Sequence, residues 1–384
     1  MQVYFDNAAT TPLHPKVLEK MLPFFTEQFG NPSSIHLFGR RARVAIEEAR
    51  ETVAAFINAN PSEIYFTSGG TESNNFIIRG IAQTEFLESG RNKIITSKTE
   101  HYSALDSVLY LTTQGFHSKF IEANFDTSIE IESLQDEIDN QTSLLSFIHI
   151  NNETGAANPI DKISSLIKSK NIFLHTDAVQ SFGKINIDVA KLGVHSLSAS
   201  AHKINGPKGT GIAYVKSGTP LSSLIIGGSQ ERNRRGGTEN IAGIVGMAAA
   251  IQIAEKEMNY NYEHVQNLRN KFINGINSID KSNIKINGGI NSSPYILSIT
   301  FLSDFYKNDA EAMLMYLDIN GVAVSNGAAC SSGTLKPSHV ILSAGYSEAD
   351  ASGTFRFSFG VQNTIQEVEY ALEVLKKMAI KFRI

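Results

Sequence analysis

Five short apolar segments with strand character follow one another in the middle of the chain, separated by stretches of helical or turn character. They lie at residues 93–97, 144–150, 172–176, 196–200 and 211–215. Strands that alternate with helices return in the same direction and pair side by side, which is the pattern of an α/β domain. An earlier apolar run at 64–67 follows an amphipathic helical pattern. We therefore expect a large α/β domain built on a mostly parallel sheet.

The character of the sequence changes after Ile251, where a long charged stretch of helical spacing leads into a turn-rich segment. Helical patterns return at 309–317 and in the closing segment 365–379. A chain of 384 residues exceeds what one small core usually holds. We expect two tightly joined domains, a large one at residues 15–255 and a smaller α+β domain formed by residues 1–14 and 256–384.

Composition excludes several classes of protein. Hydrophobic residues make up 42% and charged residues 19% of the chain, which is typical of a packed globular protein. The formal net charge of −4 and the lack of a basic tract argue against a nucleic-acid-binding surface. The first residues lack a charged region followed by an apolar run, and no segment is apolar over bilayer length, so we expect a cytoplasmic protein without membrane contact.

Polar residues follow several expected strands, at the edge where open α/β sheets place their ligands. Asp177 and Gln180 follow one strand, and Lys203 closes the next strand region in the segment SASAHK. A lysine is most often a solvated surface charge, but Ser200 and His202 place a hydroxyl and an imidazole beside this amine. An amine, phosphate-binding donors and a carboxylate able to pair with a pyridinium nitrogen together indicate a pyridoxal phosphate site.

A second candidate for phosphate binding lies in the segment SGGTE, directly after the strand at 64–67. A glycine turn that opens a helix presents backbone N–H groups and the positive end of the helix dipole to an anion. Gly70 and Thr71 are the candidate ligands. An ordinary strand-to-helix turn has the same pattern. The lack of a Walker lysine and of the full GxGxxG spacing makes a nucleotide site the poorer explanation.

Four further residues have a functional and a structural interpretation. His101 and Asn152 each follow an expected strand, where a histidine either faces a cofactor ring and moves protons or is an ordinary turn residue. Arg356 alternates with aromatic residues on an expected strand, and a half-buried guanidinium there needs a carboxylate, from a substrate or from a structural ion pair. The segment RNRRGGTEN, which contains Thr238, is either a charged loop or a phosphate ligand.

Cys330 is the single cysteine of the chain and lies in the segment SNGAACSSGT. A free cysteine is most often a small buried hydrophobic residue. Here glycines and small polar residues surround it, which favours a loop that meets solvent. A thiol in such a segment is suited to act as a nucleophile. One cysteine also excludes an intrachain disulfide and is compatible with a reducing compartment.

Together these segments resemble those of the cysteine desulfurases, pyridoxal phosphate enzymes of the class V aminotransferase group, and closely match the housekeeping iron–sulfur type. The resemblance spans nearly the whole chain and rests on DNAATTP, FGNPSSIH, FTSGGTESNN, TSKTEH, NNETG, HTDAVQ, SAHKINGPKG, RRGGTENIAGIVG and the cysteine segment followed by RFSFG. It implies a fold type I homodimer that converts L-cysteine to L-alanine. The sulfur would pass through a cysteine persulfide to an acceptor such as an iron–sulfur scaffold protein, for cluster assembly or for thio-cofactor or tRNA synthesis.

The resemblance also implies a role for each matching residue. Lys203 would hold the cofactor covalently, Asp177 would pair with its ring nitrogen, and Gln180 would contact its ring hydroxyl. His101 would stack on the ring and take part in proton transfer, and Cys330 would carry the persulfide. The other implied site residues are the phosphate ligands Gly70, Thr71, Ser200 and His202, Thr238 from a second subunit, and the substrate-carboxylate ligands Asn152 and Arg356. No metal site is expected.

Two alternatives remain open at this point. Another class V enzyme, such as an aminotransferase or a selenocysteine lyase, would share the cofactor site but use Cys330 differently or not at all. A non-catalytic sulfur-relay or scaffold subunit would keep the fold without the chemistry, although Lys203 and Asp177 are both present. Transamination yields a keto acid without sulfide, and a protein unable to take up cofactor would be colourless.

Overall fold

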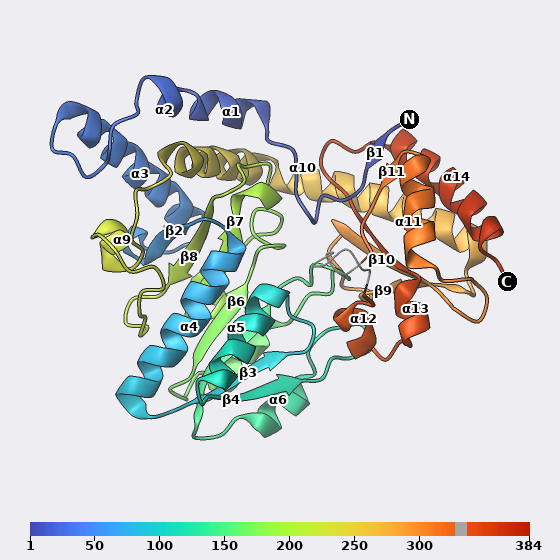
Figure 1. Cartoon of the computed structure of the whole chain (residues 1–384), viewed down its shortest axis with the longest axis horizontal. Helices are drawn as coiled ribbons and strands as arrows, with labels where there is room; N and C mark the ends of the chain where they lie inside the picture. The colour runs from blue at the N-terminus through green and yellow to red at the C-terminus, as the bar shows by residue number, and fades with distance from the viewer. Residues whose placement is uncertain (327–335) are drawn as a thin grey trace.

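The computed structural model describes residues 1–326 and 336–384, and its main sheet has seven strands in the order β2-β8-β7-β6-β5-β3-β4 (Figure 1). Their bounds are β2 (Ile64–Thr67), β3 (Lys93–Ser97), β4 (His117–Ile121), β5 (Thr142–Ile148), β6 (Phe173–Asp177), β7 (Ser196–Ser200) and β8 (Gly211–Val215). The pairs β4–β3, β3–β5, β5–β6 and β6–β7 are parallel. β8 is antiparallel to both β7 and β2, because the ten residues between β7 and β8 are too few for a crossover. The expectation of a mostly parallel sheet is confirmed.

Every strand expected from the apolar pattern is present, whereas β4 was not expected. β4 lies at the edge of the sheet, next to β3 only. Most of its side chains are exposed or half-buried, and only its last residue, Ile121, is buried. An edge strand of this kind has no apolar run, so hydrophobic periodicity does not mark it.

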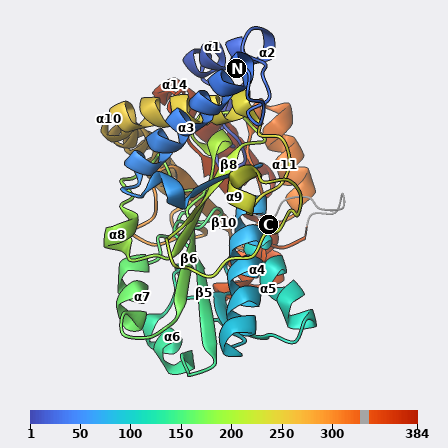
Figure 2. The same cartoon turned by 90° about the vertical axis from the view of Figure 1, so that its left-hand side faces the viewer.

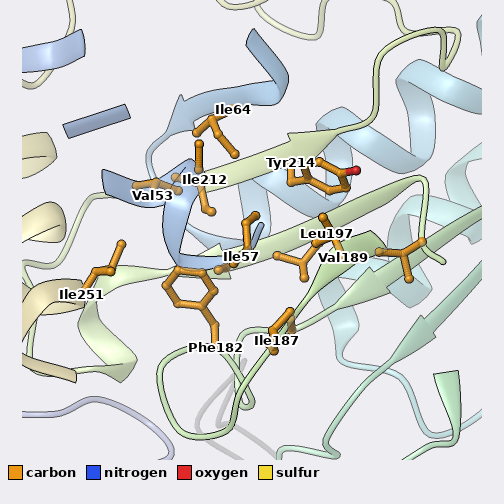
Figure 3. Close-up of a cluster of buried hydrophobic side chains, with 14 of the residues drawn as sticks. Val53, Ile57, Ile64, Phe182, Ile187, Val189, Leu197, Ile212, Tyr214 and Ile251 are labelled. Carbon is orange, nitrogen blue, oxygen red and sulfur yellow. The ribbon is translucent and has the colours of Figure 1, made fainter. Parts of the chain in front are cut away.

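Helices cover both faces of the main sheet (Figure 2). One face carries α4 (Gly70–Ser89) and α5 (Tyr102–Thr113), and the other carries α3 (Leu37–Phe56), α6 (Ile131–Glu137), α7 (Ile160–Ile167), α8 (Val189–Leu192) and the start of α10 (Ile241–Asp280). Successive strand residues point to opposite faces, so that Ile94 packs with the α4 and α5 cluster and Ile95 with the other. Figure 3 shows part of the second cluster, where Val53 lies near Ile212. Burial on both faces explains why these strands read as continuous apolar runs.

A smaller sheet of three antiparallel strands lies beside the main one, in the order β12-β10-β9. The elements of this region are β9 (Ile284–Asn287), β10 (Ile296–Phe301), α11 (Ala310–Ile319), β11 (Val322–Ala323), α12 (His339–Ser343), α13 (Glu348–Ser352), β12 (Thr354–Ser358) and α14 (Ile365–Lys381). The N-terminal strand β1 (Val3–Tyr4) pairs in parallel with β11. Phe5 packs edge-on against Phe272 and Phe359, so the two ends of the chain share one hydrophobic cluster.

The 40-residue helix α10 connects the two regions without a break. Its buried residues up to Ile251 belong to the core of the main sheet, and those from Val265 onward belong to the cluster around the smaller sheet. The change of character after Ile251 is therefore a change of packing partner along one helix. The expected domain boundary at residues 255 and 256 falls inside α10 and stays a prediction.

The remaining short elements are α1 (Pro15–Met21), α2 (Pro23–Thr26), η1 (Pro61–Glu63), η2 (Ala201–Lys203) and α9 (Gln230–Asn233). In residues 1–326 and 336–384, no helix combines the length and the apolar character needed to cross a bilayer.

Candidate active site

A cavity of about 380 Å³ lies at the carboxyl ends of the main-sheet strands and is closed by residues from the smaller sheet. It brings together side chains that follow β2, β3, β5, β6 and β7, which is where open α/β sheets bind ligands. Ten of the twelve site residues expected from the sequence line it: Gly70, Thr71, His101, Asn152, Asp177, Gln180, Ser200, His202, Lys203 and Arg356.

The amine of Lys203 is held in the cavity wall by the N-terminal segment. Its Nζ donates to the backbone carbonyls of Ala8 and Ala9, the second at 2.7 Å. Burial, followed by the nearby positive charge of Arg356, lowers the pKa of Lys203 to about 8. Near neutral pH a larger fraction of this amine than of an ordinary lysine is therefore neutral, which is the nucleophilic form.

Asp177 is the last residue of β6 and is buried in the cavity wall. One of its carboxylate oxygens accepts from the backbone N–H of Val179 at 2.9 Å, and the other accepts from Nδ2 of Asn74 at 2.6 Å. Asn74 also donates to Ser103 at 2.8 Å. The sequence interpretation missed Asn74, although it lies one helical turn after Gly70 on α4 and so shares the cavity-facing side of that helix.

His101 is the N-cap of α5, and its Nδ1 accepts from the backbone N–H of Ser103 at 3.1 Å. Because Nδ1 acts as the acceptor, the proton of the neutral ring is assigned to Nε2. Burial is the main cause that lowers the pKa of His101. The ring is therefore held neutral in one tautomer at the cavity, able to take up or release a proton.

The first turn of α4 forms the predicted anion cradle. Gly69 has a φ of 151°, which favours glycine, and a Cβ on Gly70 would lie 2.6 Å from Cγ2 of Val179. The first backbone N–H groups of this 20-residue helix have no acceptor within the helix. They belong to the same hollow as the hydroxyls of Thr71 and Ser200. These donors, together with His202, match the chemistry of a phosphate group.

Arg356 lies on β12 between two phenylalanines that point into the smaller core. Its Nη1 donates to the carbonyl of Asn152 at 2.8 Å, and its Nη2 pairs with Oδ1 of Asp6 at 3.0 Å. The structural ion pair considered from the sequence is present, with Asp6 as the partner that sequence reasoning missed. The Nε of Arg356 and the Oδ1 of Asn152 are nevertheless buried without a partner in the described residues. Unpaired buried groups at a cavity are suited to bind a polar ligand.

Three residues lie outside this arrangement or were missed. Thr238 is exposed and lines a separate hollow of about 100 Å³ with Ser68 and Arg235. Cys330 falls outside the described residues. His339 was not expected, yet it lines the cavity, and its ring nitrogen Nε2 bonds to the carbonyl of Glu100 at 2.9 Å.

The donor set of the cavity fits the expected pyridoxal phosphate. A lysine amine of lowered pKa, a buried carboxylate and an anion cradle occur in one wall, and the unpaired Nε donor of Arg356 remains for an amino-acid carboxylate. Each part was expected separately at a strand end, and the fold places them within one cavity.

Comparisons with known proteins agree with this chemistry. The family model described as aminotransferase class-V matches residues 3–371. A curated relative from Dictyoglomus turgidum, cysteine desulfurase IscS, is 45% identical over 100% of this chain and 95% of its own length. The cysteine desulfurase IscS of Clostridium botulinum is 43% identical over 98% and 94%.

Similar solved structures agree with the similarity to these curated relatives. A structure described as a NifS-like protein superposes with a TM-score of 0.91 at 37% identity and covers 100% of both chains. A structure described as SspA in complex with cysteine has a TM-score of 0.81 at 34% identity, and covers 94% of this chain and 99% of the other.

Proposed function

Since this chain belongs to the aminotransferase class-V family and is a cysteine desulfurase dependent on pyridoxal phosphate, we propose that Lys203 holds the cofactor and that Cys330 receives the sulfur of L-cysteine. The family, activity and cofactor expected from the sequence are thereby confirmed, while the role of each residue is a proposal. The observation that carries it is the amine of Lys203, with its lowered pKa, in one cavity with Asp177.

Pyridoxal phosphate, when bound, supplies an electron-accepting ring that makes the Cα proton of an amino acid acidic. Lys203 would hold it covalently, and Asp177 would keep its ring nitrogen protonated. Gln180 would donate to its ring hydroxyl oxygen. The phosphate would be bound by the first turn of α4, the hydroxyls of Thr71 and Ser200, and His202.

The chain's own residues would bind the substrate and move its protons. The unpaired Nε donor of Arg356 and the amide N–H of Asn152 would bind the carboxylate of L-cysteine and orient its Cα–H bond. The amine of Lys203, with its lowered pKa, would take up that proton, and neutral His101 would move a second proton.

In the sulfur transfer, one protein thiol would be converted to one protein persulfide. The thiolate of Cys330 attacks the substrate sulfur, an S–S bond forms, and the Cβ–S bond of the substrate breaks. The carbon takes up a proton, so that L-cysteine and one protein thiol become L-alanine and one protein persulfide.

We also propose a homodimer in which Thr238 serves the neighbouring subunit. Thr238 lies outside its own chain's large cavity, which supports this assignment. Apolar side chains on the segment from Leu22 to Phe38 are exposed, including Phe29 at 66% and Ile35 at 90%, and a second copy of the chain would cover them. Replacing Phe29 and Ile35 with aspartate should then give monomers that lose cofactor, whereas Leu87→Asp, on an exposed part of α4, should not. A fully active monomer in sedimentation would refute this proposal.

Three further expectations stay proposals. The sulfur acceptor would be a protein such as an iron–sulfur scaffold, and the location would be the cytoplasm. The division into domains at 15–255 and at 1–14 with 256–384 is supported by the two separate hydrophobic clusters that share α10.

The proposed chemistry is tested by the products formed from L-cysteine. In the presence of a thiol reductant, purified protein should release L-alanine and sulfide in equal amounts, because each persulfide is reduced once per turnover. A keto acid without sulfide would favour transamination. A protein that takes up no pyridoxal phosphate would favour the non-catalytic subunit.

A further inference from the structure

Lys184 is a buried lysine that the chemistry described so far does not use. Lys184 is 6% exposed, and its Nζ donates to Oε1 of Gln180 at 3.0 Å. The amine also lies 5.2 Å from the ring centre of Tyr295. In residues 1–326 and 336–384, no carboxylate forms an ion pair with it, although Glu257 of α10 lines the same small cavity of about 50 Å³.

A lysine at this position is costly if its only role is packing. Burying an amine without a carboxylate partner carries a large desolvation penalty, which an apolar side chain of similar length avoids. Burial, and next the positive charges of Lys203 and Arg356, lower the pKa of Lys184 to about 7. The amine can donate to Gln180 in either protonation state, so this bond does not depend on the charge.

The contact determines which way the amide of Gln180 faces. Oε1 accepts from Lys184, and Nε2 donates to the carbonyl of Ala8 at 2.9 Å. If the amide were flipped, an amide N–H would meet the lysine donor and an oxygen would meet a carbonyl. The bond to Ala8 would be lost in either protonation state of Lys184, and the bond to Lys184 would be lost whenever that amine is protonated. Nε2 therefore keeps a second N–H for a ligand, and Gln180 lines the large cavity.

The backbone carrying both residues is firmly anchored. They lie on the turn after β6, and Lys184 donates its backbone N–H to the carbonyl of Ser181 at 3.0 Å. Phe182 and Ile187 from this turn are buried in the core of the main sheet, as Figure 3 shows. The anchored backbone therefore fixes the position of Lys184 relative to Gln180.

We infer that Lys184 is a positioning residue that orients the Gln180 amide so that its free N–H faces the ring hydroxyl oxygen of the bound cofactor. The inference rests on the proposed function for the contact between Gln180 and the cofactor. Lys184 itself touches neither cofactor nor substrate and acts only through Gln180.

The test compares Lys184→Met with wild type and with Lys191→Met, a control at a lysine whose side chain is 82% exposed. Lys184→Met should bind pyridoxal phosphate roughly tenfold more weakly, as expected for one lost hydrogen bond, and should shift the absorbance of the bound cofactor. The unfolding free energy of the cofactor-free chain should change little, because relief of the buried amine's desolvation offsets the loss of the hydrogen bond to Oε1 of Gln180. A purely structural role predicts the reverse, a less stable chain with an unchanged spectrum.

A double-mutant cycle isolates the route through Gln180. Gln180→Leu should reproduce the weaker binding and the spectral shift, and adding Lys184→Met to it should change neither further. Lys184→Gln, which keeps an N–H donor, should lie closer to wild type than Lys184→Met does, and it serves if the methionine variant does not fold.

Two results would overturn the inference: wild-type affinity and spectrum in Lys184→Met, or effects that add to those of Gln180→Leu. Equal losses in Lys184→Gln and Lys184→Met are a third result that would overturn it. If wild type and Lys191→Met bind no pyridoxal phosphate, the proposed function fails first and this inference with it.

Discussion

Replacing Glu231 with glutamine should destabilise the chain strongly, because its carboxylate is paired with a buried arginine. Glu231 lies in α9, and its two oxygens accept from Nη1 and Nη2 of Arg50 on α3, each at 2.8 Å. One oxygen also accepts from the backbone N–H of Phe66 at 2.8 Å. Both side chains of the pair are only 2% exposed.

The size of the effect follows from this burial. Removing one partner of a buried ion pair costs about 3–5 kcal/mol where it leaves an uncompensated charge, and the more exposed carboxylate of Glu47, 3.1 Å from Nε of Arg50, would compensate only part of this one. That is a large share of a typical unfolding free energy of about 5–15 kcal/mol. The neighbouring pair of Arg235 and Glu72 is more exposed, at 25% and 10%. Arg235→Gln should therefore cost no more than about 1 kcal/mol.

Urea unfolding at a fixed protein concentration measures both variants, because dimer formation would otherwise change the apparent stability. The double variant Arg50→Met with Glu231→Leu should recover part of the loss, since it removes both charges together but leaves the Phe66 N–H without its acceptor. Glu231→Gln should also retain less cofactor if the loop that it anchors delivers Thr238 to a second subunit. A loss below about 1 kcal/mol in Glu231→Gln, similar to that in Arg235→Gln, would refute the reasoning from burial.

Three other changes test the site and its electrostatics. Lys203→Ala should abolish the visible absorbance of bound cofactor, and a borohydride-reducible cofactor adduct at wild-type stoichiometry in this variant would show that another lysine holds it. Cys330→Ser should stay yellow and still change its spectrum with L-cysteine, but should form no more than a trace of alanine, because a hydroxyl is hardly ionised at neutral pH. Mass analysis should find one added sulfur on the Cys330 peptide of wild type and none in the variant, and normal alanine turnover would contradict the persulfide route. Burial raises the pKa of Glu100 from 4.5 to about 8, so between these values the folded chain keeps a proton that the unfolded chain releases, and stability falls as pH rises. The stability advantage of Glu100→Gln over wild type should accordingly grow from pH 4.5 to about 8 and then level off in urea unfolding, and a difference that is constant with pH would contradict the raised pKa.

The sequence alone was sufficient for most strands of the main sheet and for the identity of most candidate groups. Apolar runs predicted β7 and β8 with their observed bounds, because strand burial on both faces leaves a continuous local signal. The polar residues after these strands could be named as ligands, since strand ends in an α/β sheet meet at one edge. The edge strand β4 escaped this reasoning because its side chains alternate between exposed and half-buried until the buried Ile121, which leaves no apolar run.

Only the tertiary structure decided how these groups act on one another. Arg356 pairs with Asp6 across 350 positions, and Lys203 reaches the carbonyl of Ala8 across 195, so neither partner is marked by local spacing. Lys184 looks like any surface lysine in the sequence, and its burial behind Gln180 depends on how the turn after β6 packs against α10 and the N-terminal segment. Hydrophobic periodicity records which face of an element is buried, whereas pKa shifts and hydrogen-bond partners depend on which distant elements cover that face.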